Sequence, residues 1–310
     1  MKPRVKYLKF LLTGLLASAL GSMVAFVSAP IIRILFNTGG SKWFWSHAIL
    51  FSAIIGVVLQ SPTAGFMLLS TWAVIGFYGE FESRGHAGKA AAFLALIFGV
   101  VIGTVGPYLW MKFSGQDLLA EIKYAFETYL AELKKSSTAD KAVLFDSINV
   151  ESLLKLIPGI LFVMHTLSLA TALVFDRQFA FLAQFRFERI ASELRLSEFR
   201  LPDWTVWVAI AAFSLSFLGL GGWPSLQMAA INVCIGLAAL YFLQGLAILE
   251  VGFLVYRVGF FIRLFAYIFL VGQLFPILIG LGFIDYWLDL RTRMRRSKMT
   301  PSGSNNGEHL

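Results

Sequence analysis

The sequence predicts an all-α protein, a polytopic helical membrane bundle of about eight transmembrane helices. The first observation is composition: 58% of the 310 residues are hydrophobic and only 14% are charged, whereas soluble domains carry roughly 25% charged residues. The second is that apolar segments of about 20 residues recur along the chain. The alternation of apolar and polar residues that marks a strand persists nowhere. These observations exclude a soluble globular protein.

The predicted spans follow one another closely, and we expect residues 1–290 to form a single transmembrane domain. In order, the spans lie near residues 8–36, 43–60, 62–79, 88–113, 153–176, 203–221, 225–250 and 258–288. The first follows a basic stretch, but its apolar run is too long for a signal peptide, which favours a retained span. Only Gln60 to Thr63 separates the second and third spans, which predicts a tight helical hairpin or a broken pair of helices.

Two longer polar connections interrupt this pattern. In residues 117–135, apolar side chains such as Ile122 and Phe126 recur at helical spacing, and acidic ones such as Glu127 fall opposite. This predicts an amphipathic surface helix. The connection 177–202 holds five arginines but no single apolar face. We expect it to continue the fifth span and then turn.

An even number of spans places both termini on the same side of the membrane. If that side is the cytoplasm, the inner segments hold 13 Lys and Arg residues and the outer loops hold 9. The positive-inside rule therefore favours cytoplasmic termini. The arginines of 177–202 count against this orientation, so the side of that connection stays open. Residues 291–310 are predicted to be a basic, then disordered, cytoplasmic tail.

The sequence shows no signature of an enzyme. It lacks a glycine-rich phosphate loop ending in Lys-Ser/Thr, a His-Glu-x-x-His pair and a Gly-x-Ser-x-Gly elbow. The four histidines are scattered and Cys234 is the single cysteine, so no metal-ligand spacing exists. We therefore expect no catalytic residues, cofactor or metal. The net charge of +8 reports orientation rather than a nucleic-acid partner.

Polar side chains inside spans are the strongest hint of function, because they are costly in the membrane. The deepest, and our candidate ligand-binding residues, are His165, Asn232, Gln244 and Gln273. For each, an interhelical hydrogen bond is the favoured alternative. The polar side chains closer to predicted span ends are Arg33, Glu250 and Arg263. Snorkelling to the interface would explain these three.

Small residues recur at four-residue spacing in the first span: Ala17, Gly21 and Ala25 share one face. Small residues allow helix backbones to approach closely. The face could therefore dock another membrane subunit, or it could pack within this protein's own bundle. The spacing alone does not separate the two.

The last span ends in Asp285, Asp289 and Arg291. Asp285 lies one turn deeper than Asp289, where an unpaired carboxylate is expensive. We expect Asp285 to bond to a basic or amide group on another helix or loop. The three residues are thus predicted to form a structural lock, and the arginines that follow to anchor the helix end.

Three motifs in the second half of the chain are more specific. They are "FRLPDWTVWV" from Phe199, "YFLQGLAILE" from Tyr241 and "LGFIDYWLDLRTR" from Leu281. In this order they resemble the YybS-type family of uncharacterised bacterial integral membrane proteins. That family is distantly similar to the substrate-binding S components of energy-coupling factor (ECF) transporters, which usually have six spans rather than eight. The resemblance implies a bacterial inner-membrane location.

The resemblance also implies a function of transport type. Such a protein would bind an unknown small solute within its bundle and depend on a partner, docked on the first span, for energy. This hypothesis expects the deep amides to face a common cavity. The alternative is a membrane scaffold or an assembly or regulatory factor, in which the amides pair across tightly packed helices.

Overall fold

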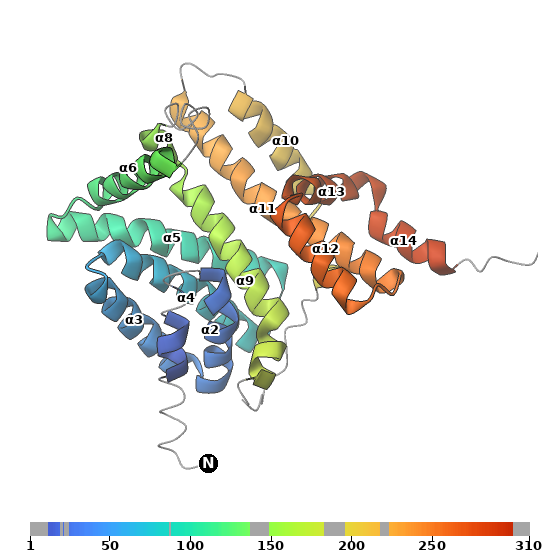
Figure 1. The fold of residues 1–310 in the computed structure, drawn as a ribbon, viewed down its shortest axis with the longest axis horizontal. Coiled ribbons are helices and arrows are strands. Elements are labelled where there is room, and N and C mark those ends of the chain that lie inside the picture. Colours follow the sequence, from blue (N-terminus) through green and yellow to red (C-terminus); the bar gives the residue numbers. More distant parts are fainter. Residues whose placement is uncertain are drawn as a thin grey trace, which may run out of the picture. The chain divides into compact units, whose positions relative to one another are not determined.

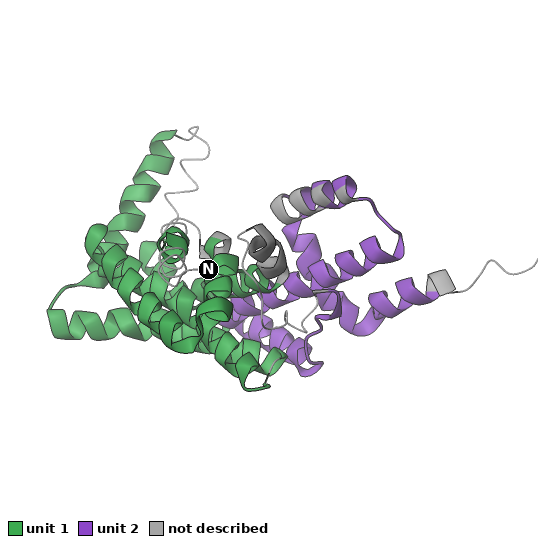
Figure 2. Ribbon diagram, turned by 90° about the horizontal axis from the view of Figure 1, so that it is seen from below, with its two compact units in different colours: residues 1–193, 220–232 green, residues 194–219, 233–310 purple. Residues whose placement is uncertain are grey.

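The structure is a computed structural model, and it describes residues 12–18, 21, 25–86, 88–136, 149–182, 196–217 and 223–299. All the regular structure in these residues is helical, which confirms the predicted all-α membrane bundle. The chain divides into two compact units, shown in Figure 2. Unit 1 comprises residues 1–193 and 220–232, and unit 2 comprises residues 194–219 and 233–310.

The helices of unit 1 follow the predicted order of spans (Figure 1). They are α2 (Ala25–Gly39), α3 (Ser41–Val58), α4 (Pro62–Ser83), α5 (Lys89–Ser114), α6 (Leu118–Ser136), α8 (Val150–Lys155) and α9 (Ile157–Leu182). Unit 2 holds the 3₁₀ turn η1 (Leu196–Glu198), α10 (Trp204–Phe217), most of α11 (Pro224–Val255), α12 (Phe260–Gly272), α13 (Phe275–Leu288) and α14 (Leu290–Met299). Helix α11 begins in unit 1 and continues into unit 2.

Four of the described helices are long and apolar enough to cross a membrane, namely α3, α4, α5 and α11. Shorter apolar helices lie at Ile157–Leu173, Trp204–Phe217 and Phe275–Leu288. The expectation of one continuous span over 258–288 is wrong, because α12 ends at Gly272 and α13 begins at Phe275. Pro276 stands in the first turn of α13, where its missing N–H leaves no hydrogen bond unmade.

The core of unit 1 is built around α4, which packs against α2, α3 and α5. Its Trp72 is fully buried, and its ring lies 5.1 Å from that of Phe44 in α3. Phe44 in turn meets Phe36 of α2 edge-on at 5.2 Å. Such aromatic contacts add to the packing that holds helices together where lipid weakens the hydrophobic drive.

The predicted hairpin of the second and third spans is confirmed, because α3 ends at Val58 and α4 begins at Pro62. Ser61 caps α4 by accepting a hydrogen bond from the Ala64 N–H. A Cβ on Gly65 would lie 2.8 Å from the Ser52 carbonyl oxygen. Only glycine therefore allows the two helices to approach this closely.

In unit 2, α11 and α13 cross at two glycines. A Cβ on Gly245 of α11 would lie 2.0 Å from the Leu278 oxygen, and one on Gly282 of α13 would lie 2.0 Å from the Tyr241 oxygen. The two backbones thus touch without intervening side chains, as small residues permit in membranes.

The polar connections are helical where they are described. Helix α6 confirms the amphipathic helix predicted at 117–135. Helix α9 continues the fifth span to Leu182, as expected, and residues 183–195 of the arginine-rich connection lie outside the described residues. The basic stretch predicted as the start of a tail forms α14, and residues 300–310 also lie outside the described residues.

Candidate functional site

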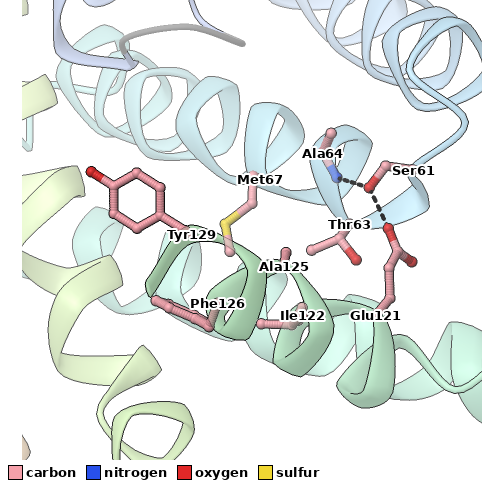
Figure 3. Close-up of a pocket in the computed structure, with 9 residues that line it drawn as sticks. All are labelled: Ser61, Thr63, Ala64, Met67, Glu121, Ile122, Ala125, Phe126 and Tyr129. Atoms are coloured by element: carbon pink, nitrogen blue, oxygen red, sulfur yellow. Dashed lines mark hydrogen bonds between the residues drawn. The ribbon is translucent and has the colours of Figure 1, made fainter. Parts of the chain in front are cut away.

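A pocket of about 340 Å³ lies between the start of α4 and α6 (Figure 3). Its apolar lining comes from Met67 of α4 and from Ile122, Phe126 and Tyr129 of α6. The α6 residues recur at helical spacing, so the same amphipathic face that defines the helix also forms the pocket wall. Concave, mainly apolar sites of this kind are typical of small-molecule binding.

One end of the pocket is polar. Ser61 donates a hydrogen bond from Oγ to a Glu121 carboxylate oxygen at 2.8 Å, and Figure 3 shows this contact beside the Ala64 N–H. Thr63 Oγ1 is buried and makes no hydrogen bond within the described residues. The Glu121 carboxylate lies near the start of α4, where a helix dipole favours negative charge. The pocket can therefore accept a molecule with an apolar body and a hydrogen-bonding end.

His165, a predicted ligand-binding residue, lies in α9 and is 2% exposed. Its ring packs against α5 at Gly99, where an added Cβ would be 3.1 Å from Cδ2 and 3.4 Å from Nε2. Neither ring nitrogen makes a hydrogen bond with good geometry to a described group. A buried polar group left in this way costs about 1–3 kcal/mol.

Other buried polar atoms of unit 1 share this condition. Those with no hydrogen bond to a described group are Ser18 Oγ, Ser52 Oγ, Thr166 Oγ1 and Trp72 Nε1. In the described part of unit 2, no buried side-chain atom is left in this state. Because most buried polar groups in proteins are hydrogen-bonded, these atoms distinguish unit 1 from the described part of unit 2.

Asn232, the second predicted ligand-binding residue, closes the break between α8 and α9. Its Oδ1 accepts from the Gly159 N–H at 2.8 Å, and its Nδ2 donates to the Lys155 carbonyl at 2.9 Å and to the Met228 carbonyl at 3.0 Å. An N–H in the first turn of α9 and the last carbonyl of α8 are thus satisfied by one amide. Asn232 and His165 share no hydrogen bond.

The amide of Gln244 also hydrogen-bonds to backbone groups. Oε1 accepts from the Leu201 N–H at 2.9 Å, and Nε2 donates to the Gly282 carbonyl at 2.9 Å. Gln273 differs, since it is the exposed residue that ends α12. The two residues therefore occupy different environments within unit 2.

Asp285, fully buried, lies at the centre of a polar network. One oxygen accepts from the Leu290 N–H at 2.9 Å, and the other accepts from Arg291 Nη2 at 2.7 Å and from Gln244 Nε2 at 3.4 Å. Arg291 also donates to the Phe199 carbonyl at 2.7 Å. The structure thus brings together Asp285, Arg291 and Gln244, the basic and amide partners that an interior carboxylate requires.

Asp289 stands beside this network. It has φ 42°, a left-handed conformation, at the junction of α13 and α14. Its carboxylate lies 3.7 Å from Arg200, and both side chains are more than 40% exposed, at 44% and 42%. An ion pair this exposed contributes little to stability. At the junction of α13 and α14, the stabilising interactions are therefore mainly those of the buried Asp285.

Among the ion pairs missed by the sequence analysis, two are partly buried. Arg33 of α2 is 1% exposed and donates to both oxygens of Glu82 in α4, at 3.1 and 3.0 Å. Its guanidinium also lies over the Tyr78 ring, 5.5 Å from the centroid. The expectation that Arg33 snorkels to the interface is therefore wrong. A pair 49 residues apart in sequence leaves no local pattern by which to find it.

The second pair joins α11 and α12. Arg263 lies 3.8 Å from Glu250 and donates to the carbonyls of Val258 at 2.8 Å and Phe253 at 3.2 Å. Basic side chains commonly bind the free carbonyls at a helix C-terminus. The position of Arg263 just after a helix break was the available signal.

Of the small-residue face, Ala17 is fully buried in the core of unit 1. A Cβ on Gly21 would lie 2.9 Å from Leu68 of α4. Both are covered by the protein's own helices, as the packing alternative expects. The Ala25 side chain lies outside the described part of the structure.

A family model described as a predicted membrane protein, DUF2232, matches residues 7–286. No curated protein and no solved structure matches the chain.

Proposed function

The chain belongs to the DUF2232 family of predicted membrane proteins, and we propose that it is a transport-type protein that binds a small solute in unit 1. The observation that carries this proposal is the pocket between α4 and α6, which joins an apolar wall to a polar end formed by Ser61, Thr63 and Glu121. Its volume, about 340 Å³, falls at the lower end of the range for small-molecule sites, roughly 300–1,000 Å³.

The finer proposal follows the resemblance to YybS-type proteins and to ECF S components. The protein would reside in a bacterial inner membrane with cytoplasmic termini, act without enzymatic chemistry, and obtain energy from a partner. A ligand contact by His165 stays a separate part of this proposal, since His165 is buried and is not among the residues that line the pocket. Asn232 and Gln244 are less suited, because their amides already bind backbone groups.

That use of the amides favours the alternative function, a membrane scaffold or an assembly or regulatory factor. Asn232 and Gln244 join helices tightly, and Gln244 belongs to the network of Asp285 and Arg291. A scaffold requires helices that are held together by such hydrogen bonds, but it does not require a pocket. The occupancy of the pocket therefore separates the two functions.

Native mass spectrometry of gently purified full-length protein tests the proposal. We expect a small molecule to be retained by the natural protein and lost from Ala125→Trp, which fills the pocket. Ala131→Trp, on the same helix but outside the pocket lining, should retain it. Protein that is persistently free of small molecules, or equal retention by both variants, would overturn solute binding at this site and leave the scaffold.

A further inference from the structure

The helix α14 carries only positive charge. Its sequence, LRTRMRRSKM, holds four arginines and one lysine and no acidic residue. We propose that α14 is a binding surface for the headgroups of anionic phospholipids. This proposal is independent of solute binding in unit 1, because it rests on residues of unit 2 alone.

One face of α14 is fixed against the protein. Arg291 is 7% exposed and bonds to Asp285 and to the Phe199 carbonyl. Three residues further on, Met294 faces α11, since its sulfur would lie 3.7 Å from a Cβ on Gly252. Residues three apart share a helix face, so Arg291 and Met294 define the inner side.

The other arginines point outward. Arg293, Arg295 and Arg296 are all exposed. The two carboxylates at the junction already have cationic partners, Arg291 for Asp285 and Arg200 for Asp289. The outer side of α14 is thus exposed and positively charged.

The position of α14 indicates which anion it meets. The preceding helix, α13, exposes Ile277, Ile284, Trp287 and Leu288, an apolar surface that suits lipid tails. That surface stops at Asp289, where the left-handed turn ends α13. Tryptophan is enriched at the membrane–water interface, so Trp287 marks the headgroup level, and α14 begins there.

Chemistry then selects the ligand. Guanidinium groups bind phosphate oxygens in a bidentate manner, and clusters of basic residues next to a membrane helix attract anionic lipids. A nucleic acid would meet the same charges, but the apolar surface directly before α14 favours a molecule with both tails and a phosphate. The expected ligand class is therefore a diacyl lipid with a phosphodiester headgroup, such as phosphatidylglycerol.

The test titrates purified full-length protein with phosphatidylglycerol or with phosphatidylcholine of the same acyl chains, and counts retained lipids by native mass spectrometry. We expect preferential retention of phosphatidylglycerol. The variant R293Q/R295Q/R296Q should weaken that retention on the order of 100-fold, about fivefold per charge removed. The control K42Q/R84Q/K112Q removes three exposed charges from unit 1 and should change it less than about twofold.

Three outcomes would overturn the proposal: equal retention of both lipids, equal weakening in the control variant, or unchanged retention in the α14 variant. A short single-stranded RNA is added in a parallel titration. If RNA is bound, the lipid is not, and RNA binding is lost in the α14 variant, the surface belongs to a nucleic acid instead. Equal thermal unfolding midpoints for the natural protein and all variants would show that each variant is folded.

Discussion

The two units treat their buried polar groups differently. In unit 2, the Asp285 carboxylate bonds to Gln244 and Arg291, and the three side chains bond to backbone groups of the segment after η1, of α13 and of α14. In unit 1, the buried Trp72 ring nitrogen bonds to no described group, and the buried His165 ring meets the Gly99 backbone without a hydrogen bond of good geometry. A polar side chain beside a helix break has a structural reason to be in the membrane. A polar side chain inside a packed helix, without a hydrogen-bond partner, has no such structural reason. Unit 1 is therefore the better place to look for a functional site.

The buried arginines show the same contrast. Arg291 lies six residues from Asp285 and closes the junction between α13 and α14. Arg33 of α2 instead bonds to Glu82 of α4, and both residues lie within continuous helices. The first pair holds a turn in place, whereas the second fixes how two long helices align.

The largest effect is expected from Asp285→Ala. It leaves Arg291 buried and without its carboxylate and removes the acceptor of the Leu290 N–H. Losing one partner of a buried pair destabilises by about 3–5 kcal/mol. Thermal unfolding in detergent and folded yield measure this. Asp289→Asn, at an exposed and left-handed position that Asn tolerates, is the control; equal loss in both variants would contradict a special role for Asp285.

A slightly smaller loss, about 3 kcal/mol, is expected for Gly282→Ala, since the new Cβ would lie 2.0 Å from the Tyr241 oxygen and overpacking forces the helices apart. Gly280→Ala on the same helix meets nothing within 4 Å and should be nearly neutral. Unfolding midpoints of the two variants give the difference. If both are neutral, α11 and α13 do not cross as described.

Arg33→Met should destabilise unit 1 by about 2 kcal/mol, less than Asp285→Ala because Glu82 is 20% exposed and regains water. A double-mutant cycle with Glu82→Gln isolates the pair, and a coupling of about 0.5–3 kcal/mol is expected. The cycle of Arg84 with Glu80, where Arg84 is 72% exposed, should give less than about 0.5 kcal/mol. Equal couplings would show that burial does not distinguish the pairs.

The smallest effect is expected from His165→Leu, within about 1 kcal/mol of the natural protein. The substitution removes a ring whose contact with the Gly99 backbone is not a hydrogen bond of good geometry. The matched variant Gln244→Leu should lose about 2–3 kcal/mol, because the Leu201 N–H and Gly282 carbonyl lose their partner. A loss at His165 as large as that at Gln244 would erase the contrast between the units.

Much of the fold could be predicted from hydropathy, since a helix that crosses a membrane must be long and apolar. Hydropathy alone was sufficient to predict the spans that correspond to α3, α4 and α5. The break between α12 and α13 was hidden because the residues at the break continue the apolar run, although Gly272 and Pro276 carried the signal.

The candidate pocket could not be predicted in the same way. The apolar face of α6 was visible in sequence. The polar end of the pocket was not, because the hydrogen bond from Ser61 to Glu121 joins residues 60 apart. The polar network around Asp285 lay partly within reach, because a deep carboxylate requires a partner. That Gln244 is one of its partners depends on the crossing of α11 and α13, which no local pattern encodes.

The length of a short helix also constrains the lipid around it. Helix α13 has 14 residues and so reaches about 21 Å, whereas α5 with 26 residues reaches about 39 Å. A hydrocarbon layer is about 30 Å thick, so α13 cannot cross an undeformed layer alone. Lipids beside α13 must thin to cover its apolar surface, at a modest free-energy cost for each ångström of mismatch. Bilayers of shorter acyl chains should therefore suit α13 better than bilayers matched to α5.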